Sequence, residues 1–231
     1  MDRGAHLKSA LLLDYNGVIV QDESLHFDSF REVLGESGIE LSRDEYDHTY
    51  LGIDDRAAFR EAARRYRIGG DLEELVQRKS RRYRAMAEQS IEIVPGVTRF
   101  VREAARECHV AVVSGALRAE VPPGLERAGI ADLVEVLLSS DDVSTSKPDP
   151  TSYRTALRQL AARHGNGGWR AVVIEDSLPG IGAARNLGAG CVAITTSHAP
   201  AALQHADAVW DSFEDHDPSE LGTLWREVAV P

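Results

Sequence analysis

The chain has 231 residues, a composition typical of globular proteins and a formal net charge of −11 at neutral pH. This charge excludes a general nucleic-acid binder, because phosphate backbones repel an acidic surface. No apolar run approaches the roughly 20 residues that a membrane-spanning helix requires, so we expect no membrane contact.

The first segment, residues 1–17, is slightly basic and contains a short apolar stretch. It runs into an acidic residue without a small-residue cleavage site, so we expect no signal peptide and a cytoplasmic protein. In a chain of this size, Cys108 and Cys191 are expected to be buried free thiols, with a single disulfide as the alternative.

An apolar run ends abruptly at Asp14 within LLLDYNGVIV, residues 11–20. Residues 10–13 show no polar alternation, which predicts a strand buried on both faces. A carboxylate at the edge of a core is costly unless something there uses or neutralises it. Asp14 is therefore a candidate functional residue, although it could also close a turn with Asn16 and Gly17.

The pattern is helical throughout from residue 27 to residue 90. The apolar side chains of its first stretch share one helical face: Phe27, Phe30, Val33 and Leu34. A Pro-Gly pair then marks the return to the main domain. We expect residues 25–91 to form a helical cap, a candidate lid over the strand tips. Residues 1–24 and 92–231 are expected to form the core.

Four further apolar, β-rich runs follow, at residues 110–113, 134–138, 171–174 and 191–195. Helical stretches lie between most of them, at residues 98–107, 152–163 and 179–187. Alternating strands and helices predict an α/β fold, a doubly wound parallel sheet.

Chemically active side chains occur at the carboxyl ends of the predicted strands. They are Asp14 after the first, Ser114 and Gly115 after the second, Lys147 after the third, and Glu175 and Asp176 after the fourth. The carboxyl ends of parallel strands open onto one crevice, where ligands bind. Clustered carboxylates need a cation, and hard oxygen ligands suit Mg²⁺. Ser114 and Lys147 are donors for an anion, so the set indicates phosphoryl transfer with Asp14 as candidate nucleophile.

Each of these motifs also has a purely structural interpretation. Ser114 and Gly115 could form a plain turn, Lys147 could be a solvated loop residue, and Asp176 could cap the next helix. Ser177 can also cap that helix, so capping and metal binding do not exclude each other. We favour function because four motifs occur in order at strand ends.

The motifs DYNGV, VVSG, SKPDP and IEDSLPGIGAA resemble, in this order, the haloacid dehalogenase superfamily, and within it the β-phosphoglucomutase-like phosphatases and mutases. The resemblance implies a Rossmann-like core with a small all-helical cap inserted after the first strand. It also implies that Asp14 is the nucleophile. The implied Mg²⁺ ligands are Asp14, the backbone carbonyl of Asn16, and Asp176, with Glu175 nearby. The phosphate is expected to be held by Ser114, Gly115 and Lys147.

Asn16 departs from the pattern of the family that the chain resembles. Members that act on phosphate esters usually have aspartate there, which serves as acid and base. An amide cannot exchange a proton near neutral pH, and general acid–base catalysis is typically worth about 10²–10⁴-fold. Three interpretations remain open. The leaving group needs no proton, as in an acyl phosphate; His26, Lys79 or a substrate hydroxyl supplies it; or the protein binds phosphorylated ligands with little or no turnover.

Candidate substrate-binding residues lie in the cap and after the second core strand. His26 matches a family position that faces the cleft, and Lys79 with Tyr83 matches a family K-x-x-x-Y pattern. Arg56, in LGIDDRAAF, and Arg118, in SGALRAEV, are further candidates. Five basic residues between positions 78 and 84, Lys79 among them, are interpreted as a solvated helical face. A cationic lid would attract an anionic substrate.

We therefore predict a Mg²⁺-dependent hydrolase of a small phosphorylated metabolite, working through an aspartyl phosphate at Asp14. The alternatives are a β-phosphoglucomutase-like phosphosugar mutase and a catalytically impaired binding protein. Dehalogenation is disfavoured because Glu175 and Asp176 favour a metal, and phosphonate cleavage would need a Schiff base at Lys79. The protein is expected to be a monomer whose partner is the metabolite, not nucleic acid or a membrane.

Overall fold

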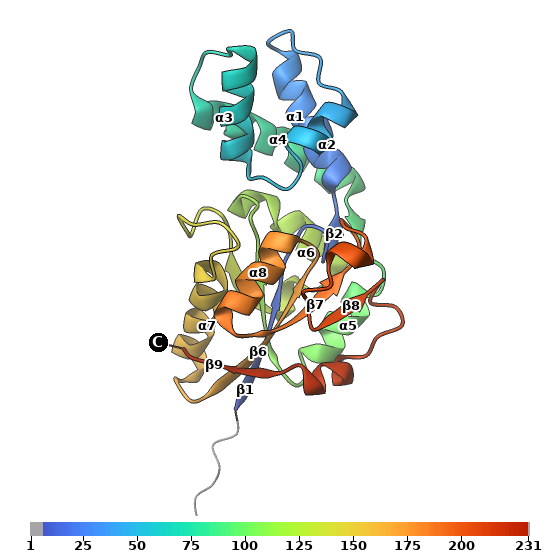
Figure 1. Cartoon of the computed structure of the whole chain (residues 1–231), viewed down its shortest axis with the longest axis vertical. Coiled ribbons are helices and arrows are strands. Elements are labelled where there is room, and N and C mark those ends of the chain that lie inside the picture. Colours follow the sequence, from blue (N-terminus) through green and yellow to red (C-terminus); the bar gives the residue numbers. More distant parts are fainter. Residues whose placement is uncertain (1–6, 231) are drawn as a thin grey trace, which may run out of the picture.

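The computed structural model describes residues 7–230, and a sheet forms the centre of its larger part (Figure 1). The strands are β1 (Lys8–Leu13), β4 (His109–Val113), β5 (Val134–Leu138), β6 (Trp169–Glu175), β7 (Gly190–Ile194), β8 (Ala208–Trp210) and β9 (Arg226–Val228). Their spatial order is β5-β4-β1-β6-β7-β8, all parallel, and β9 pairs antiparallel with β6. This arrangement confirms the predicted α/β class with a parallel sheet.

Strand β1 lies between β4 and β6 in the middle of the sheet. Because side chains alternate along a strand, Leu11 and Leu13 pack into the hydrophobic cluster on one face and Leu12 into the cluster on the other. All three are fully buried, and each burial contributes roughly 1.5–3 kcal/mol. Two covered faces explain why the sequence shows no polar alternation here.

Helices cover both faces of the sheet. They are α5 (Val97–Ala104), α6 (Pro122–Ala128), α7 (Thr151–His164) and α8 (Leu178–Leu187). Phe100 of α5 and Leu125 of α6 belong to the first cluster, whereas Tyr153 and Leu157 of α7 belong to the second. Short 3₁₀ segments connect the elements: η1 (Arg118–Glu120), η2 (Ala131–Leu133), η3 (Pro200–Ala202) and η4 (Pro218–Thr223). The three helices predicted in this part are present, the first ending at Ala104.

Four other helices lie together at one end of the molecule, above the sheet in Figure 1. They are α1 (Glu23–Gly35), α2 (Arg43–Thr49), α3 (Asp55–Tyr66) and α4 (Leu72–Ser90). The predicted apolar face of α1 is buried in a hydrophobic cluster of their own, which contains Phe27, Phe30, Val33, Leu34, Tyr46, Tyr50, Phe59 and Val76. This bundle therefore has a hydrophobic core of its own, which Leu117 from the loop after β4 also joins.

The chain leaves the sheet and returns to it side by side. Strand β2 (Val20–Gln21) leads into α1, and β3 (Glu92–Ile93) follows α4; the two pair antiparallel. Helix α4 takes part in two cores, because Val76 belongs to the bundle cluster and Tyr83 and Ala87 belong to the first sheet cluster. The short strands β2, β3, β8 and β9 escape prediction because two or three residues show no periodicity.

The two cysteines form no disulfide, as predicted. Cys191 is buried, and Cys108 is only partly buried. Within residues 7–230, no helix is both long and apolar enough to cross a membrane. The expected lack of a signal peptide rests partly on residues 1–6, which lie outside the described part of the chain.

Candidate active site

Three neighbouring strands bring the predicted strand-end residues together. Asp14 directly follows β1, Ser114 directly follows β4, and Asp176 follows β6. Glu175 is the last residue of β6 itself. Since β4, β1 and β6 are adjacent and parallel, their carboxyl ends form one edge of the sheet. All four side chains are buried, so the polar groups are concentrated where little water can reach them.

Lys147 connects two of these carboxylates. Its Nζ donates to Asp14 Oδ1 and to Glu175 Oε1, both at 2.6 Å, and to the carbonyl of Val113 at 3.3 Å. Tyr153 OH donates to the same Oε1 of Glu175 at 2.5 Å. Burial disfavours the ammonium, but the two carboxylates outweigh this effect and raise the pKa of Lys147. The interpretation of Lys147 as a solvated loop residue is therefore wrong.

Negative charge dominates this edge of the sheet. Carboxylate oxygens of Asp14, Glu175 and Asp176 lie within 4.8 Å of one another. Burial raises the pKa of Asp14 to about 7 against the lowering effect of Lys147, and Glu175 adds to the rise. Burial, Asp14 and Glu175 likewise raise the pKa of Asp176 well above its ordinary value. When all three carboxylates are ionised, the one ammonium leaves an excess negative charge of two, and this oxygen donor set fits a divalent hard cation such as Mg²⁺.

A loop after β7, which was not predicted from the sequence to belong to the site, holds Asp176 in place. Ser197 Oγ donates to Asp176 Oδ2, and His198 Nδ1 lies 3.1 Å from the carbonyl oxygen of Asp176. Thr196 Oγ1 donates to the carbonyl of Gly17 at 2.5 Å. The loop therefore ties the segment after β1 to the segment after β6. Its sequence signal is modest: a run of hydroxyl residues that directly follows a buried strand.

Two glycines allow this close packing. Gly17 has φ +73°, and a Cβ there would overlap the carboxylate of Asp176. A Cβ on Gly180 would overlap the carboxylate of Glu175. Ser177 caps α8 by accepting from the backbone N–H of Gly180 at 3.1 Å. The helix cap is thus Ser177, so Asp176 is free of the capping role considered for it.

The amide of Asn16 has a defined orientation. Its Nδ2 donates to Asp22 Oδ2 at 2.7 Å, and its Oδ1 faces Ser114 Oγ at 3.4 Å. Ser114 Oγ also accepts from the backbone N–H of Ala116 at 2.9 Å. Asp22 is 2% exposed, so an aspartate in place of Asn16 would put two carboxylates side by side. The amide avoids this repulsion, which gives a local physical reason for asparagine.

His26 and Lys79 form a buried polar network next to Asn16. Lys79 Nζ lies 2.6 Å from His26 Nδ1 and 2.9 Å from Asp55 Oδ2. Because an ammonium can only donate, Nδ1 accepts, and Nε2 carries the proton of a neutral ring. That Nε2 lies 3.2 Å from Asp22 Oδ2 and 3.1 Å from Asn16 Nδ2. The network thus joins the Asp14 loop to the helical bundle.

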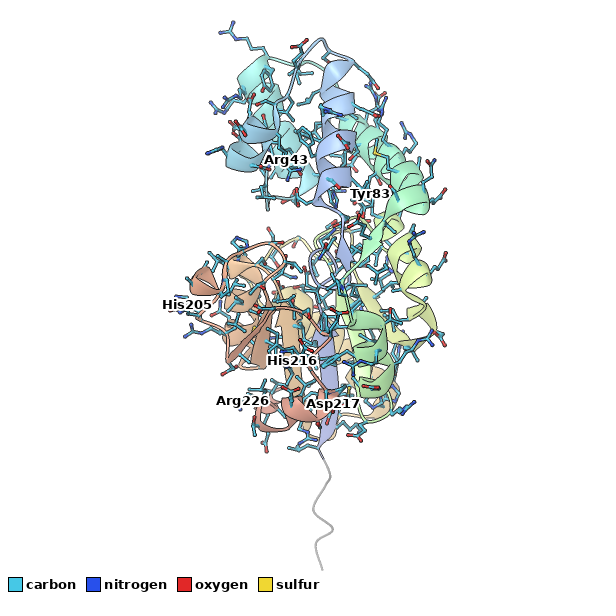
Figure 2. All side chains as sticks on the ribbon, turned by 90° about the vertical axis from the view of Figure 1, so that its right-hand side faces the viewer. Arg43, Tyr83, His205, His216, Asp217 and Arg226 are labelled. Atoms are coloured by element: carbon cyan, nitrogen blue, oxygen red, sulfur yellow. The ribbon has the colours of Figure 1, made fainter. Side chains whose placement is uncertain are left out.

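Tyr83 completes the network. Its hydroxyl donates to Asp22 Oδ2, and its ring stacks on His26 with centroids 4.4 Å apart. Figure 2 shows Tyr83 near the junction between the bundle and the sheet. Burial works against ionisation of Asp22, but contacts with His26, Tyr83 and Asn16 lower its pKa. Asp22 therefore stays anionic.

The other predicted substrate residues are engaged elsewhere. Arg56 donates to Glu73 at 3.0 Å and lies 3.5 Å from Asp141, which links the bundle to the core. Arg118 donates to Asp142 at 2.6 Å and to the carbonyl of Leu137 at 3.1 Å. Gly115 is exposed beside Ser114. The roles of Arg56, Arg118 and Gly115 in substrate binding stay predictions.

The basic helix is only partly as predicted. Arg78 pairs with Glu36, and Arg82 with Glu32 and Glu36, and the two arginine side chains are about one-third exposed. Lys79, in contrast, is 1% exposed. The expectation of a fully solvated cationic face is therefore wrong for Lys79. Its charge is neutralised inside the molecule, because Asp55 and Glu120 lie 2.9 and 3.7 Å from its Nζ.

Comparisons with known proteins agree with this geometry. The sequence profile of haloacid dehalogenase-like hydrolases matches residues 11–194. Protein CbbY from Cereibacter sphaeroides is 31% identical over 93% of this chain and 94% of its own length. Validoxylamine A 7'-phosphate phosphatase from Streptomyces hygroscopicus subsp. limoneus is 39% identical over 42% of this chain and 44% of its own. A crystal structure of a mutant CbbY from Rhodobacter sphaeroides with xylulose-(1,5)bisphosphate has a TM-score of 0.75 and 28% identity, covering 89% of this chain and 95% of that one.

Proposed function

The chain belongs to the haloacid dehalogenase-like hydrolases, and we propose that it hydrolyses small phosphorylated sugars through a phosphoaspartate at Asp14. The family and its phosphatase members support the general statement that it is a hydrolase of phosphorylated metabolites. The observation that carries the finer proposal is the contact between Asp14 and Lys147 at the edge of the sheet, beside Glu175 and Asp176.

We assign the first step to Asp14. Its free carboxylate oxygen attacks phosphorus, the P–O bond to the sugar breaks, and the phosphoryl group becomes bound to Asp14. Ser114 and Lys147 supply the donors that hold the phosphate oxygens. The residues that would hold Mg²⁺ are Asp14, Asp176 and the backbone carbonyl of Asn16, with Glu175 beside them, and the ion would neutralise charge between carboxylate and phosphate. Water then attacks the phosphoaspartate and releases inorganic phosphate.

The leaving sugar oxygen needs a proton, and Asn16 cannot supply it. We assign this task to His26, whose Nε2–H lies next to Asn16, where the family usually places a carboxyl group. Lys79 donates to Nδ1 on the opposite side of the ring. A proton leaving from Nε2 can therefore be compensated by one arriving from Lys79 at Nδ1. This favours the second of the three interpretations of Asn16.

We also propose that residues 25–91 act as a cap over this edge of the sheet. The separate hydrophobic cluster of the bundle and the β2–β3 pair at its base support this division. Lys79 and Arg56 reach the core from the bundle, through Glu120 and Asp141 respectively. The free thiols of Cys108 and Cys191 are in keeping with the cytoplasmic location that we expect.

Phosphate release from a substrate panel tests the proposed function. In the presence of Mg²⁺, the protein is expected to release phosphate from sugar monophosphates or sugar bisphosphates, and chelation of Mg²⁺ is expected to stop the release. The panel includes acetyl phosphate, whose leaving group needs no proton. Turnover of acetyl phosphate alone would contradict an acid at His26. Conversion of a sugar monophosphate only with a bisphosphate primer would show a mutase instead.

Replacing His26 with glutamine is expected to lower sugar phosphate hydrolysis by about 10²–10⁴-fold, the usual worth of a general acid. Hydrolysis of acetyl phosphate is expected to change much less, because acetate leaves without a proton. Steady-state rates on both substrates, measured against pH, check this difference. His205→Gln is the matched control, because His205 is an exposed histidine.

Asn16→Asp provides a rescue of the His26 variant. In the double variant, the new carboxyl group would lie beside Asp22, and like-charge repulsion would raise one of the two pKa values. A proton donor would thus return to the usual family position, and ester hydrolysis is expected to recover. Equal losses on esters and acetyl phosphate, without rescue, would show that His26 only positions the loop.

A further inference from the structure

A second polar cluster lies away from Asp14. His109 is the first residue of β4, Glu135 is the second residue of β5, and His164 is the last residue of α7. Ser114 follows the opposite end of β4, about five residues or roughly 16 Å further along the strand. The cluster therefore lies at the amino end of the sheet, whereas the proposed catalytic residues lie at its carboxyl end.

Both oxygens of Glu135 are engaged by imidazole nitrogens. His109 Nδ1 lies 2.7 Å from Glu135 Oε1, and His164 Nε2 lies 2.5 Å from Glu135 Oε2. The two rings stack with centroids 3.9 Å apart and an interplanar angle of 27°. These three side chains are 28–33% exposed. An ion in solution could therefore reach them without rearrangement of the core.

The surroundings hold the three side chains in this arrangement. The ring of Trp169 lies 5.4 Å from that of His109 and is itself buried. Arg163, next to His164, donates to the backbone carbonyl of Glu135. Three elements that are distant in sequence thus present two imidazoles and one carboxylate to one point. Hydrogen bonding explains each histidine–glutamate contact separately, but it gives no reason for two histidines to meet at the same carboxylate.

We propose that His109, Glu135 and His164 form a second metal site that binds a divalent transition-metal ion of the Zn²⁺ type. Their ligand atoms lie within 4.8 Å of one another. Two imidazoles and a carboxylate suit Zn²⁺, which takes nitrogen and oxygen ligands at about 2.0–2.2 Å, with water in the remaining position. The all-oxygen set at Asp14 suits Mg²⁺ instead. On binding, each neutral imidazole shifts its proton to its other ring nitrogen, and the ion replaces the hydrogen bonds to Glu135.

The proposed ion would stabilise the edge of the sheet. β5 is the outermost strand on its side of the sheet, and His164 ends the helix that packs against it. Coordination would link β5, β4 and α7 through one centre. The expected effect of Zn²⁺ is therefore a higher melting temperature, with no requirement for Zn²⁺ in phosphate release.

Zn²⁺ titration by calorimetry in saturating Mg²⁺ tests this proposal. The wild-type protein is expected to bind one Zn²⁺ that Mg²⁺ does not displace. His164→Gln and His109→Gln are each expected to weaken binding at least roughly tenfold, since even changes beyond the direct ligands cost that much. Asp176→Asn is expected to retain the site, which separates it from the proposed catalytic cation site.

His216→Gln is the matched control, and Figure 2 labels this residue. His216 also pairs with a glutamate, at 2.9 Å from Glu220, and also stacks on a tryptophan, Trp210. Within residues 7–230, no second histidine contacts that glutamate, so the His216 variant is expected to bind Zn²⁺ as the wild type does. Unchanged affinity in both His109→Gln and His164→Gln, or no Zn²⁺ uptake by the wild type in saturating Mg²⁺, overturns the proposal. If His109→Gln does not fold, His164→Gln at the partly exposed helix end decides.

Discussion

Replacing Asp14 with alanine or asparagine is expected to lower phosphate release by roughly 10⁴- to 10⁶-fold, the scale of losing a nucleophile in a hydrolase. Neither alanine nor a neutral amide can form the phosphoaspartate. Each change also removes one of the three carboxylates that lie within 4.8 Å of one another. The measurement is Mg²⁺-dependent phosphate release, from sugar phosphates and from acetyl phosphate alike. A variant that keeps more than a few per cent of the wild-type rate would refute a nucleophile at Asp14.

The metal-free stability of Asp14→Asn serves as its folding control. The folded-state pKa of Asp14, about 7 because of burial and Glu175, exceeds its value of about 3.9 in unfolded chains. A carboxyl group whose pKa rises on folding stabilises the protein at low pH and loses this contribution as pH rises through that window. We expect the wild-type melting temperature to fall between about pH 4 and pH 7, and the fall to be smaller in Asp14→Asn. An equal fall in the melting temperature of the wild type and Asp14→Asn would contradict the assignment of this pH dependence to Asp14.

Replacing Lys147 with alanine is expected to affect both activity and stability. Within residues 7–230, Lys147 is the cation that donates to both Asp14 and Glu175. Loss of a preorganised charge that contacts the phosphate is expected to reduce the rate by about 10²–10³-fold or more. Glu175 is fully buried, and breaking a buried ion pair from one side costs about 3–5 kcal/mol.

Asp14→Asn and Lys147→Ala are thus expected to have different effects on the melting temperature of the metal-free protein. Asp14→Asn removes a charge from an overcrowded site and is expected to keep or raise the melting temperature. Lys147→Ala removes the compensating charge and is expected to lower it. Thermal unfolding with and without Mg²⁺, next to phosphate release, distinguishes the two. Lys8→Ala is the control, since Lys8 donates to the carbonyl of Gly165 on the surface and forms no ion pair among residues 7–230. A stable and active Lys147→Ala would contradict the proposed role.

Much of the core could be predicted because its strands are buried on both faces. The run before Asp14 has no polar alternation, and parallel strands end at one edge, so the grouping of Asp14, Ser114 and Glu175 followed from chain order. The family motifs implied the same nucleophile and cap that the residues had already suggested, and the comparisons confirm the family. Three-residue strands such as Ala208–Trp210 carry too little pattern to be recognised.

The environment of Asn16 could not be predicted in the same way. Its partners Asp22 and His26 depend on how α1 and α4 pack onto the core, and that packing is set by contacts distant in sequence. Lys79 lay in a basic run that suggested exposure, yet the position of α4 buries it against His26 and Asp55. Ser197 was missed because a hydroxyl residue after a strand is only a weak signal until its partner Asp176 is known.

The pairing of β2 with β3 has a consequence for how this protein can change. Val20 lies opposite Ile93 and Gln21 opposite Glu92, so a long stretch of chain begins and ends at nearly one point. An insertion with adjacent ends can be lengthened, shortened or exchanged while the sheet around it still folds as before. Selection can therefore alter the helices one surface residue at a time without rebuilding the carboxylate edge. Such a protein can diversify by changing its helical bundle while its sheet stays the same. The last turns of α4 are the exception, because Tyr83 and Ala87 pack in the first hydrophobic cluster of the sheet.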